Sequence, residues 1–258
     1  MLYRYETHLH TREASACGLV GGREYIRYYQ DLGYTGIVVT DHFFGGNTAV
    51  DRSLPWPEQV NRFCAGYEAA RNEGEKHGLQ VLFGWEQGYR GDEYLVYGLS
   101  KAWLLEHPEV KQWTLPEQFA QAHRYGGCVV QAHPFRERSY IHRVRLNPRL
   151  VDGVEVYNAA NSAAENALAY RYAQRLELTM FAGSDIHDIP WPQHGGIDLP
   201  EPLVDEADLA RRVREHAAIA PAGAVPPAPD APPNVPTLPV VVLGEDGMPA
   251  QVPLASLL

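Results

Sequence analysis

The chain is poor in cysteine and lacks long hydrophobic runs. Its three cysteines, Cys17, Cys64 and Cys128, stand far apart among 258 residues and form no CxxC pair. A scattered, odd-numbered set of thiols is typical of a reducing compartment, so we expect a cytoplasmic protein. No apolar stretch is long enough to span a bilayer, and the first residues do not resemble a signal peptide. We therefore expect no membrane partner.

Basic residues are also scarce. Lysine and arginine together number 22 against 32 acidic residues, which gives a formal net charge of −10. A nucleic-acid-binding protein normally carries a basic face, so this balance argues against nucleic acid as a partner. A small anionic substrate is still compatible with it, because local arginines and metal ions override the global charge. The sequence leaves the oligomeric state open.

Short β-branched and aromatic runs alternate with helical patterns along most of the chain. Strands are expected at residues 2–5, 36–40, 79–85, 93–98, 128–132, 153–157 and 178–182, and helices at 23–32, 57–77, 115–125, 162–176 and 205–216. This alternation predicts an α/β fold with a mainly parallel sheet and crossover helices. With 45% hydrophobic residues the chain can bury a large core. We assign residues 1–219 to this domain.

The last stretch, residues 220–258, has a different composition. Residues 220–239 are rich in alanine and proline, which is typical of a linker or an extended wrap without a core of its own. Residues 240–252 form either a small hairpin around Gly244–Gly247 or a loosely held tail. We therefore treat residues 220–258 as a Pro-rich extension of the domain.

Polar side chains follow several of the expected strands directly. They are His8 and His10, Asp41 and His42, Glu86, His133, and Asp185 and His187. The carboxyl ends of parallel barrel strands share one face, where catalytic residues usually sit. Alternate residues of a strand point to the same side, so His8 and His10 are placed to hold one metal ion. A single His-x-His pair could equally be solvated, but the repetition favours a metal centre.

The ligand types indicate which metals this centre would take. Imidazoles and carboxylates without a convincing thiolate suit Zn²⁺, Mn²⁺ or Fe better than Mg²⁺ or Ca²⁺. Two or three such ions close together hydrolyse phosphoesters, because a metal-bound water loses its proton near neutral pH and attacks phosphorus. No nucleophile elbow is present, so the expected nucleophile is this metal-bound hydroxide.

The ordered set of motifs resembles the PHP family, named for polymerase and histidinol phosphatase. The motifs are His8-x-His10, Thr40-Asp41-His42, the strand end at Glu86, Ala132-His133-Pro134 and Ser184-Asp185-x-His187, and the resemblance covers residues 3–215. It implies a distorted (β/α)7 TIM-like barrel that holds two or three divalent transition-metal ions. His8 and His10 would share one ion with Glu86 and Asp185. Glu86 would bridge to a second ion held by His133, and His42 and His187 would hold another, with Asp41 orienting the ligands.

Two positions depart from the family pattern. Many members have a further ligand in the loop after His-x-His, where this chain offers Glu13 and Cys17, and we expect Glu13 to serve. Many members also have a histidine between the positions of Glu86 and His133, where this chain has Tyr94. His107 and His123 are the available substitutes, but both are expected at the surface. The sequence therefore does not decide whether a third metal site is complete.

The substrate side of the centre is expected on the loops that follow the later strands. Arg136, three residues after His133, is a fork-shaped cation suited to a phosphate group. Arg138 and Asn158 are further candidates for substrate binding, and His194 for the cleft. We assign Asp185, His187 and Arg136 to the catalytic centre.

Three functions are compatible with these residues. We expect a metal-dependent phosphoesterase that acts on a small phosphorylated metabolite of the histidinol phosphate or nucleotide phosphate class. An amidohydrolase-type metal hydrolase is the first alternative, although such enzymes usually place a lysine at a strand end and this chain has none there. A non-catalytic accessory barrel is the second, and it would have eroded ligands.

Overall fold

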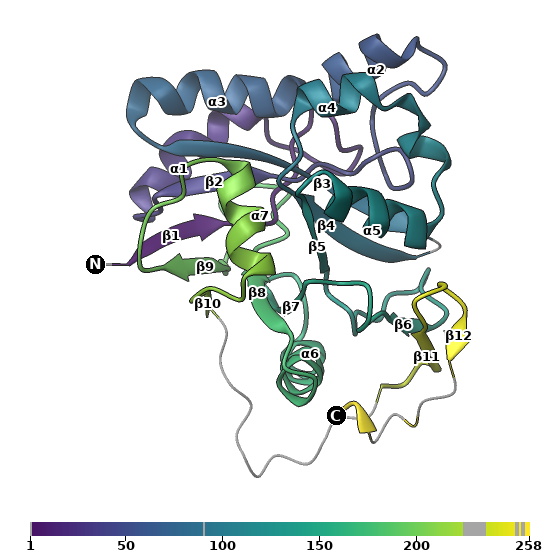
Figure 1. Cartoon of the computed structure of the whole chain (residues 1–258). Coiled ribbons are helices and arrows are strands. Elements are labelled where there is room, and N and C mark those ends of the chain that lie inside the picture. Colours follow the sequence, from purple (N-terminus) through teal and green to yellow (C-terminus); the bar gives the residue numbers. More distant parts are fainter. Residues whose placement is uncertain (1, 90, 224–235, 251–252, 254–255) are drawn as a thin grey trace.

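The computed structural model describes the chain apart from residues 1, 90, 224–235, 251–252 and 254–255 (Figure 1). Its main sheet has nine strands in the order β10-β9-β1-β2-β3-β4-β5-β7-β8. The strands are β1 (Tyr3–Glu6), β2 (Gly36–Val39), β3 (Gln80–Tyr89), β4 (Asp92–Tyr97), β5 (Cys128–Gln131), β7 (Gly153–Asn158), β8 (Thr179–Gly183), β9 (Gly196–Leu199) and β10 (Ala220–Ala222). Strand β10 pairs with β9, so the main sheet extends past residue 219.

The sheet curls into a nearly closed barrel, which confirms the expected distorted TIM-like architecture. Pairing is parallel between β1 and β2, β2 and β3, β5 and β7, and β7 and β8. Beyond β1 and β8, a parallel bridge between Leu9 and Ile186 brings the two ends of the barrel together. The distortion lies in β4, which runs antiparallel to both β3 and β5.

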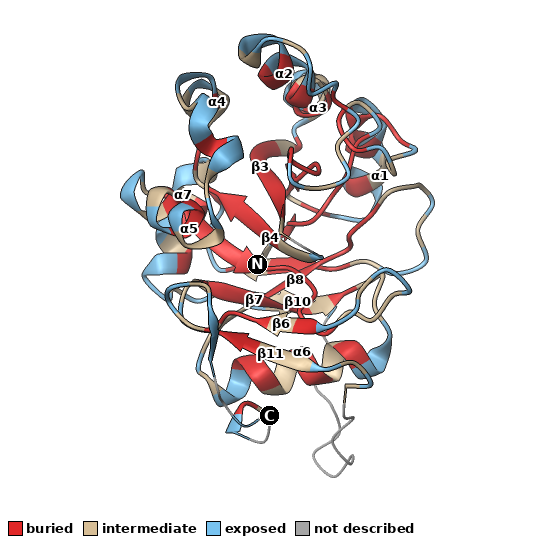
Figure 2. Ribbon diagram, turned by 90° about the vertical axis from the view of Figure 1, so that its right-hand side faces the viewer, coloured by how far each residue is buried: buried red, intermediate tan, exposed pale blue. Residues whose placement is uncertain are grey.

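Two hydrophobic layers follow from the alternation of side chains along the strands. Val38 of β2 and Leu82 of β3 belong to the layer inside the barrel. Their neighbours Ile37 and Phe83 face outward and pack against the helices. Figure 2 shows the resulting arrangement, with buried strands in the middle and helices whose outer faces are exposed.

Seven α-helices and two short 3₁₀ segments surround the strands in the described part of the chain. They are η1 (Gly22–Glu24), α1 (Tyr25–Asp31), α2 (Trp56–Phe63), α3 (Ala65–His77), α4 (Lys101–Glu106), η2 (Pro108–Gln112), α5 (Leu115–Arg124), α6 (Ala163–Arg175) and α7 (Glu206–Arg214). The single helix expected at 57–77 is broken at Cys64 into α2 and α3. None of these helices has the length and apolar character needed to cross a membrane.

The C-terminal stretch returns to the barrel as a small second sheet. Strands β11 (Val240–Leu243) and β12 (Pro249–Ala250) form a hairpin, and β11 also pairs in parallel with β6 (Val144–Leu146) (Figure 1). The carboxylate of Glu137 accepts hydrogen bonds from the backbone of Thr237 and Leu238. The tail is thus attached to the segment between β5 and β6, while most of the Pro-rich stretch lies outside the described residues.

Candidate metal centre

The strand-end residues meet at one face of the barrel, as the parallel strands require. Four groups of side chains bring their nitrogen or oxygen atoms within 4.8 Å of one another. The groups are His8, His10 and Asp185; His8, Glu86 and His133; His42, Glu86 and Glu93; and His10, His42 and His187. Shared members join the four groups into one cluster.

Glu86 lies at the middle of this cluster. One of its oxygens is 3.2 Å from Nε2 of His8 and 3.2 Å from Nε2 of His133, and the other is 2.7 Å from Nδ1 of His42. The carboxylate is completely buried. Two oxygens that face different imidazoles can serve two cations at once.

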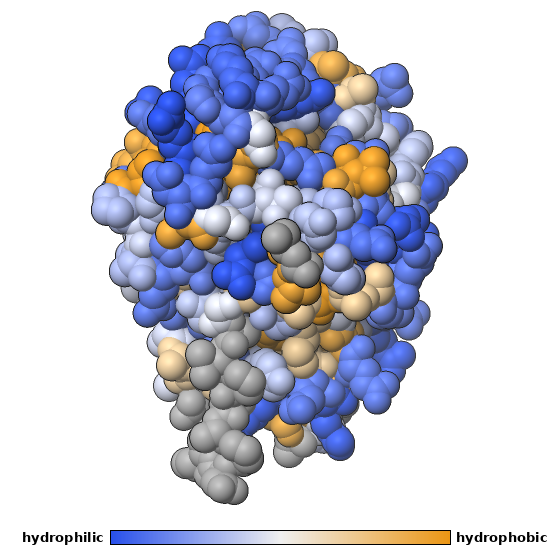
Figure 3. Space-filling model, turned by 90° about the vertical axis from the view of Figure 1, so that its left-hand side faces the viewer, coloured by the Kyte–Doolittle hydropathy of each residue, from blue (hydrophilic) through white to orange (hydrophobic). Residues whose placement is uncertain are grey.

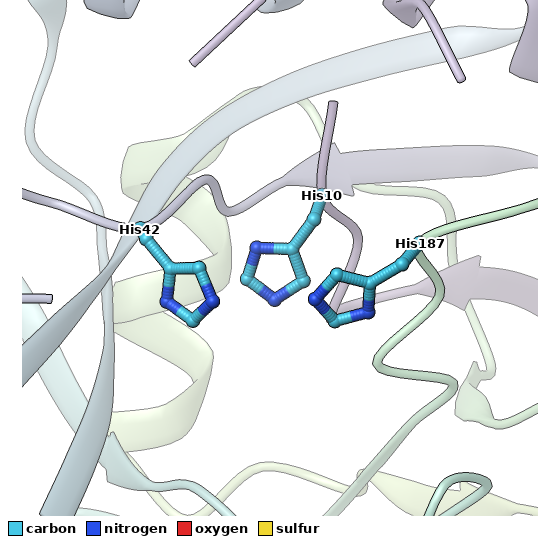
Figure 4. Close-up of side chains that lie close together, drawn as sticks. All are labelled: His10, His42 and His187. Carbon is cyan, nitrogen blue, oxygen red and sulfur yellow. The ribbon is translucent and has the colours of Figure 1, made fainter. Parts of the chain in front are cut away.

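His10 connects Asp185 to the remaining histidines. Its Nε2 atom lies 3.2 Å from Oδ1 of Asp185. Its ring stacks between those of His42 and His187, with centroids 4.3 Å away on each side. Figure 4 shows the three rings side by side, although they come from three separate stretches of the chain.

Several atoms of the cluster are buried without a partner. Nε2 of His8, Nε2 of His10, Nδ1 of His42 and one oxygen of Glu86 have neither solvent contact nor a hydrogen bond among the described residues. Leaving a buried polar atom unsatisfied costs about 1–3 kcal/mol, so such atoms rarely gather without a ligand. Divalent cations satisfy this requirement, since imidazole and carboxylate are their usual ligands.

A surrounding layer of hydrogen bonds fixes the histidine tautomers. Nδ1 of His8 faces Oε1 of Glu155 at 3.0 Å, and Nδ1 of His10 faces Oγ of Ser15 at 3.2 Å. The Ser15 hydroxyl donates to Asp41, so it accepts from His10. Both rings therefore keep the proton on Nδ1 and direct a free Nε2 to the cluster, as metal-binding histidines do.

Backbone conformation at the cluster is unusual. His133 has φ 29° and Asp185 has φ 52°, a left-handed region that non-glycine residues seldom adopt. Gly183, two residues before Asp185, packs so closely that a Cβ atom would lie 2.5 Å from Cβ of His8. Strained backbone that surrounds a polar cluster is common at functional sites.

Charges and burial within the site keep two of the candidate ligands, Asp185 and His10, in metal-binding forms. Burial alone would raise the pKa of Asp185, but Arg136 and His8 outweigh it and hold the pKa well below its ordinary value. Burial and the neighbouring His42 lower the pKa of His10 well below its ordinary value. Asp185 is thus ionised and His10 neutral near neutral pH.

Glu93 is a member of the cluster that the sequence analysis missed. Its carboxylate oxygens lie 3.6 Å from Nδ1 of His42 and 3.5 Å from Nε2 of His133. Because β4 runs antiparallel to β3, its first residues lie at the same edge as the last residues of β3. Tyr94, the position considered from sequence, points outward against Phe119.

Glu13 does not join the cluster. Its carboxylate accepts a hydrogen bond from the backbone of Gly22, at the start of η1. Cys17, four residues further along the same loop, instead lines a cavity together with His42 and His187. Burial would raise the pKa of the Cys17 thiol, but its hydrogen bonds to these two histidines lower that pKa to about 6.

The other histidines considered from sequence lie elsewhere. His107 stacks on Trp103, His123 pairs with Asp152, and Nε2 of His194 lies 2.7 Å from the hydroxyl of Tyr28. None of the three belongs to a metal-binding group of the described residues.

Arg136 reaches the edge of the cluster. Its guanidinium donates to Asp185 and, at 2.9 Å and 2.8 Å, to Asn158 and Asn161. Asn158 is completely buried and donates in turn to Glu155, so its side chain contacts the residues that surround the cluster. Arg138 donates to Glu165 and to the backbone of Ala160, which takes it away from the cluster.

A cavity of about 400 Å³ opens over the cluster. Its walls are formed by Cys17, His42, Asn47, Glu86, Glu93, Arg136, Tyr140, Asp185 and His187. The Tyr140 side chain is 66% exposed and stands at the mouth. This volume is in the range of small-molecule sites.

Comparison with known proteins identifies the fold. Neither a protein-family model nor a curated protein matches the chain. A protein from Bifidobacterium adolescentis, provisionally assigned as a metal-dependent phosphoesterase, aligns with a TM-score of 0.51 and 18% identity over 83% of this chain and 96% of its own. A two-domain protein from Bacteroides vulgatus that contains a predicted PHP-like metal-dependent phosphoesterase also aligns. Its TM-score is 0.59 at 17% identity, over 86% of this chain and 64% of its own.

An amidohydrolase from Chromobacterium violaceum, with bound sulfate and no metal, also aligns. Its TM-score is 0.51 at 16% identity, over 87% of this chain and 98% of its own. At such identities the likeness is one of fold. The resemblance to the PHP family that the sequence motifs indicate is therefore confirmed in the architecture of the barrel.

Proposed function

We propose that the chain is a metal-dependent phosphoesterase of the PHP family that hydrolyses a small phosphorylated metabolite. The observation that carries the proposal is the environment of Glu86. This buried carboxylate is surrounded by the imidazoles of His8, His42 and His133, and several of the facing atoms have no partner among the described residues. Buried polar atoms without partners cost free energy, and bound cations would remove that cost.

Two groups of residues would hold the ions. His8, His10, Glu86 and Asp185 would hold one. Glu86 and Glu93 would hold another together with His133, whose Nε2 faces both carboxylates. Bound Zn²⁺, Mn²⁺ or Fe would supply Lewis acidity towards phosphate and a water molecule of lowered pKa. Glu86 would belong to both groups, because its oxygens face His8 and His133.

The substrate phosphate would be oriented by Arg136. The guanidinium uses Nε and one terminal nitrogen to bind Asn161, Asn158 and Asp185. Its other terminal nitrogen makes none of the hydrogen bonds found among the described residues, so it is available to a phosphate oxygen. Arg136 would thus position both the substrate and Asp185.

The cavity supports a phosphoesterase more than the alternative hydrolase. No lysine is among the residues that line the described cavity, whereas an amidohydrolase-type site usually has one. The lining of the cavity therefore favours a phosphate group as the reacting part of the substrate.

The test is phosphate release by the purified protein after metal removal and reloading with Mn²⁺ or Zn²⁺. We expect activity on at least one member of a panel of histidinol phosphate, nucleotide monophosphates and sugar phosphates. Glu86→Gln keeps the shape of the side chain and should lose both metal and turnover. Glu13→Gln, a carboxylate change outside the cluster, is the matched control. Absence of bound metal together with absence of phosphate release would refute the proposal.

A further inference from the structure

One buried carboxylate outside the cluster collects hydrogen bonds from several segments of the chain. Glu6 is the last residue of β1. Its Oε1 atom accepts from the backbone amides of Thr7, His8 and Ser184, at 2.9, 2.8 and 2.9 Å. Its Oε2 atom accepts from the hydroxyls of Ser184 and Tyr29. Five donors from three separate stretches of the chain thus meet on one side chain.

Glu6 stands where two ligand-bearing segments come together. Residues 7–10 follow β1, residues 184–187 follow β8, and each segment carries two candidate ligands. A parallel bridge between Leu9 and Ile186 joins the segments directly. In a continuous parallel ladder, backbone amides donate to carbonyls of the neighbouring strand. Here the carboxylate of Glu6 accepts from amides of both segments, so it replaces part of the ladder.

This network is closed to solvent. Figure 3 shows the molecule from the side on which the N-terminus lies, where mainly hydrophilic side chains form the outer surface. Glu6, Ser184 and Tyr29, in contrast, are completely buried. Buried donors that lose their acceptor remain unsatisfied, so each of these hydrogen bonds depends on the carboxylate.

The carboxylate of Glu6 is occupied by donors and not by the cluster. It belongs to none of the metal-binding groups found among the described residues. The hydroxyl of Ser184 accepts from the amide of Gly195 at 2.9 Å, so its own hydrogen is directed to Glu6. Glu6 therefore acts on the ligands through the backbone that carries them.

We propose that Glu6 is a positioning residue, which fixes His8 and Asp185 relative to each other for one metal ion. The inference rests on the proposed function, since it concerns one of the two metal positions described there. Nε2 of His8 lies 3.5 Å from Oδ1 of Asp185. The amides of His8 and of Ser184, the residue before Asp185, donate to the same oxygen atom of Glu6. Loss of this oxygen should therefore shift one ligand against the other.

The test measures the Zn²⁺ affinity of the full-length protein at one metal position at a time, by competition with a chromophoric chelator. The first position is the one that includes His10, and the second is the one that includes His133. His133→Ala isolates the first position, and His10→Ala isolates the second. Each background then receives substitutions of Glu6.

Glu6→Leu keeps much of the side-chain volume but removes both acceptors. In the His133→Ala background it should weaken Zn²⁺ binding by about 10- to 100-fold, as loss of a group that orients metal ligands usually does. In the His10→Ala background it should leave the affinity unchanged. Glu6→Gln keeps one carbonyl oxygen for the amides, and its NH₂ group can donate to hydroxyls that turn to accept. It should therefore recover most of the loss.

Tyr29→Phe tests the same network with a smaller change. It removes one donor to Glu6 and should weaken the first position less than Glu6→Leu does. Tyr28→Phe is the matched control, because the Tyr28 hydroxyl contacts Trp191 and His194 and not Glu6. This pair of tyrosine variants decides the question if Glu6→Leu does not fold.

The outcomes separate the inference from the proposed function. Unchanged affinity of the first position in Glu6→Leu, or equal affinity in Tyr29→Phe and Tyr28→Phe, overturns the inference and leaves the phosphoesterase proposal standing. An equal loss at both positions also overturns it, because Glu6 would then support the barrel as a whole. A Glu6→Gln variant that binds no better than Glu6→Leu overturns it too. An unaltered protein that binds no Zn²⁺ overturns both proposals.

Discussion

Nδ1 of His8 lies 3.0 Å from a carboxylate oxygen of Glu155, and both side chains are completely buried. The second oxygen of Glu155 accepts from the backbone of His133 and from Asn158. One carboxylate thus fixes the ring of one candidate ligand and the backbone of another. Its loss should affect metal binding although it touches no metal itself.

Glu155→Ala should weaken metal binding by about 10- to 100-fold, the usual effect of removing a carboxylate behind a ligating histidine. Competition with a chromophoric chelator measures this affinity. Glu201→Ala, at an exposed carboxylate, should bind metal as the unaltered protein does. Equal affinity of both variants would show that Glu155 does not orient His8.

Arg136→Ala should retain its metals and lose roughly 10- to 150-fold in kcat/KM, the effect of one lost charge-assisted hydrogen bond of ~1.5–3 kcal/mol. Arg136→Lys keeps the positive charge but loses the planar guanidinium that can donate two hydrogen bonds at once, so its kcat/KM should be intermediate. Steady-state kinetics and metal analysis of both variants provide the measurement. Unchanged kinetics in Arg136→Ala would mean that phosphate is held elsewhere.

Tyr140 is expected to influence which substrates bind, because it is 66% exposed at the mouth of the cavity. Stacking on an aromatic ring contributes about 0.5–1.5 kcal/mol. Tyr140→Ala should therefore raise KM by roughly 2- to 10-fold for a nucleotide monophosphate, and Tyr140→Phe should not. An equal rise in KM for glycerol phosphate, which has no ring, would contradict a stacking role.

Glu165 should make folding stability depend on pH. Burial would raise its pKa, but hydrogen bonds from the backbone of Glu137 and Ser162 outweigh burial and lower it. A lowered pKa in the folded state stabilises the protein above the unfolded-state value near 4.5. That contribution is lost as the pH falls through the folded-state pKa.

Urea unfolding of metal-free protein between pH 7 and pH 3 measures this effect. Glu165→Gln should lower the free energy of unfolding by about 0.5–2 kcal/mol at pH 7, as for other helix caps. The difference between the two proteins should shrink as the pH falls. A constant difference would show that the charge of Glu165 is not what stabilises α6.

Removal of the tail should affect the cavity rim more than the metals. A chain that ends after Gly223 keeps β10 but loses β11, which pairs with β6. It also loses the hydrogen bond between Thr237 and Glu137. Because Glu137 is next to Arg136, we expect a lower Tm and a higher KM at unchanged metal content. Metal analysis, thermal unfolding and kinetics check the three parts. Loss of metal would show that the tail supports the centre directly.

The sequence was sufficient to locate most strand ends, because hydrophobic runs followed by His, Asp or Glu are local signals. The reversal of β4 also has a local signal, because the short connection between the strands expected at 79–85 and 93–98 leaves no room for the crossover that parallel strands need. Glu93 is nevertheless absent from the expected ligands, because the position compared with the family pattern was Tyr94, which points to the other side of the same strand.

Supporting residues were harder to foresee than ligands. Glu155 stands in the middle of an apolar strand, and only the packing of β7 beside β8 places its carboxylate against His8. The choice between Glu13 and Cys17 depended on the path of one loop, which is fixed by contacts to distant segments. Such contacts produce no periodic pattern of residues that could be recognised in the sequence.

The reversed β4 strand also bears on the order in which the centre forms. Glu86 and Glu93 belong to one hairpin, so their part of the cluster requires only contacts close in sequence. His8 and Asp185 come together only when β1 and β8 approach, which closes a loop of most of the chain. Short loops close faster and at lower entropic cost than long ones. We therefore expect the part of the cluster formed by Glu86 and Glu93 to assemble early in folding. Binding of an ion by Glu86 together with Asp185 would then report closure of the barrel.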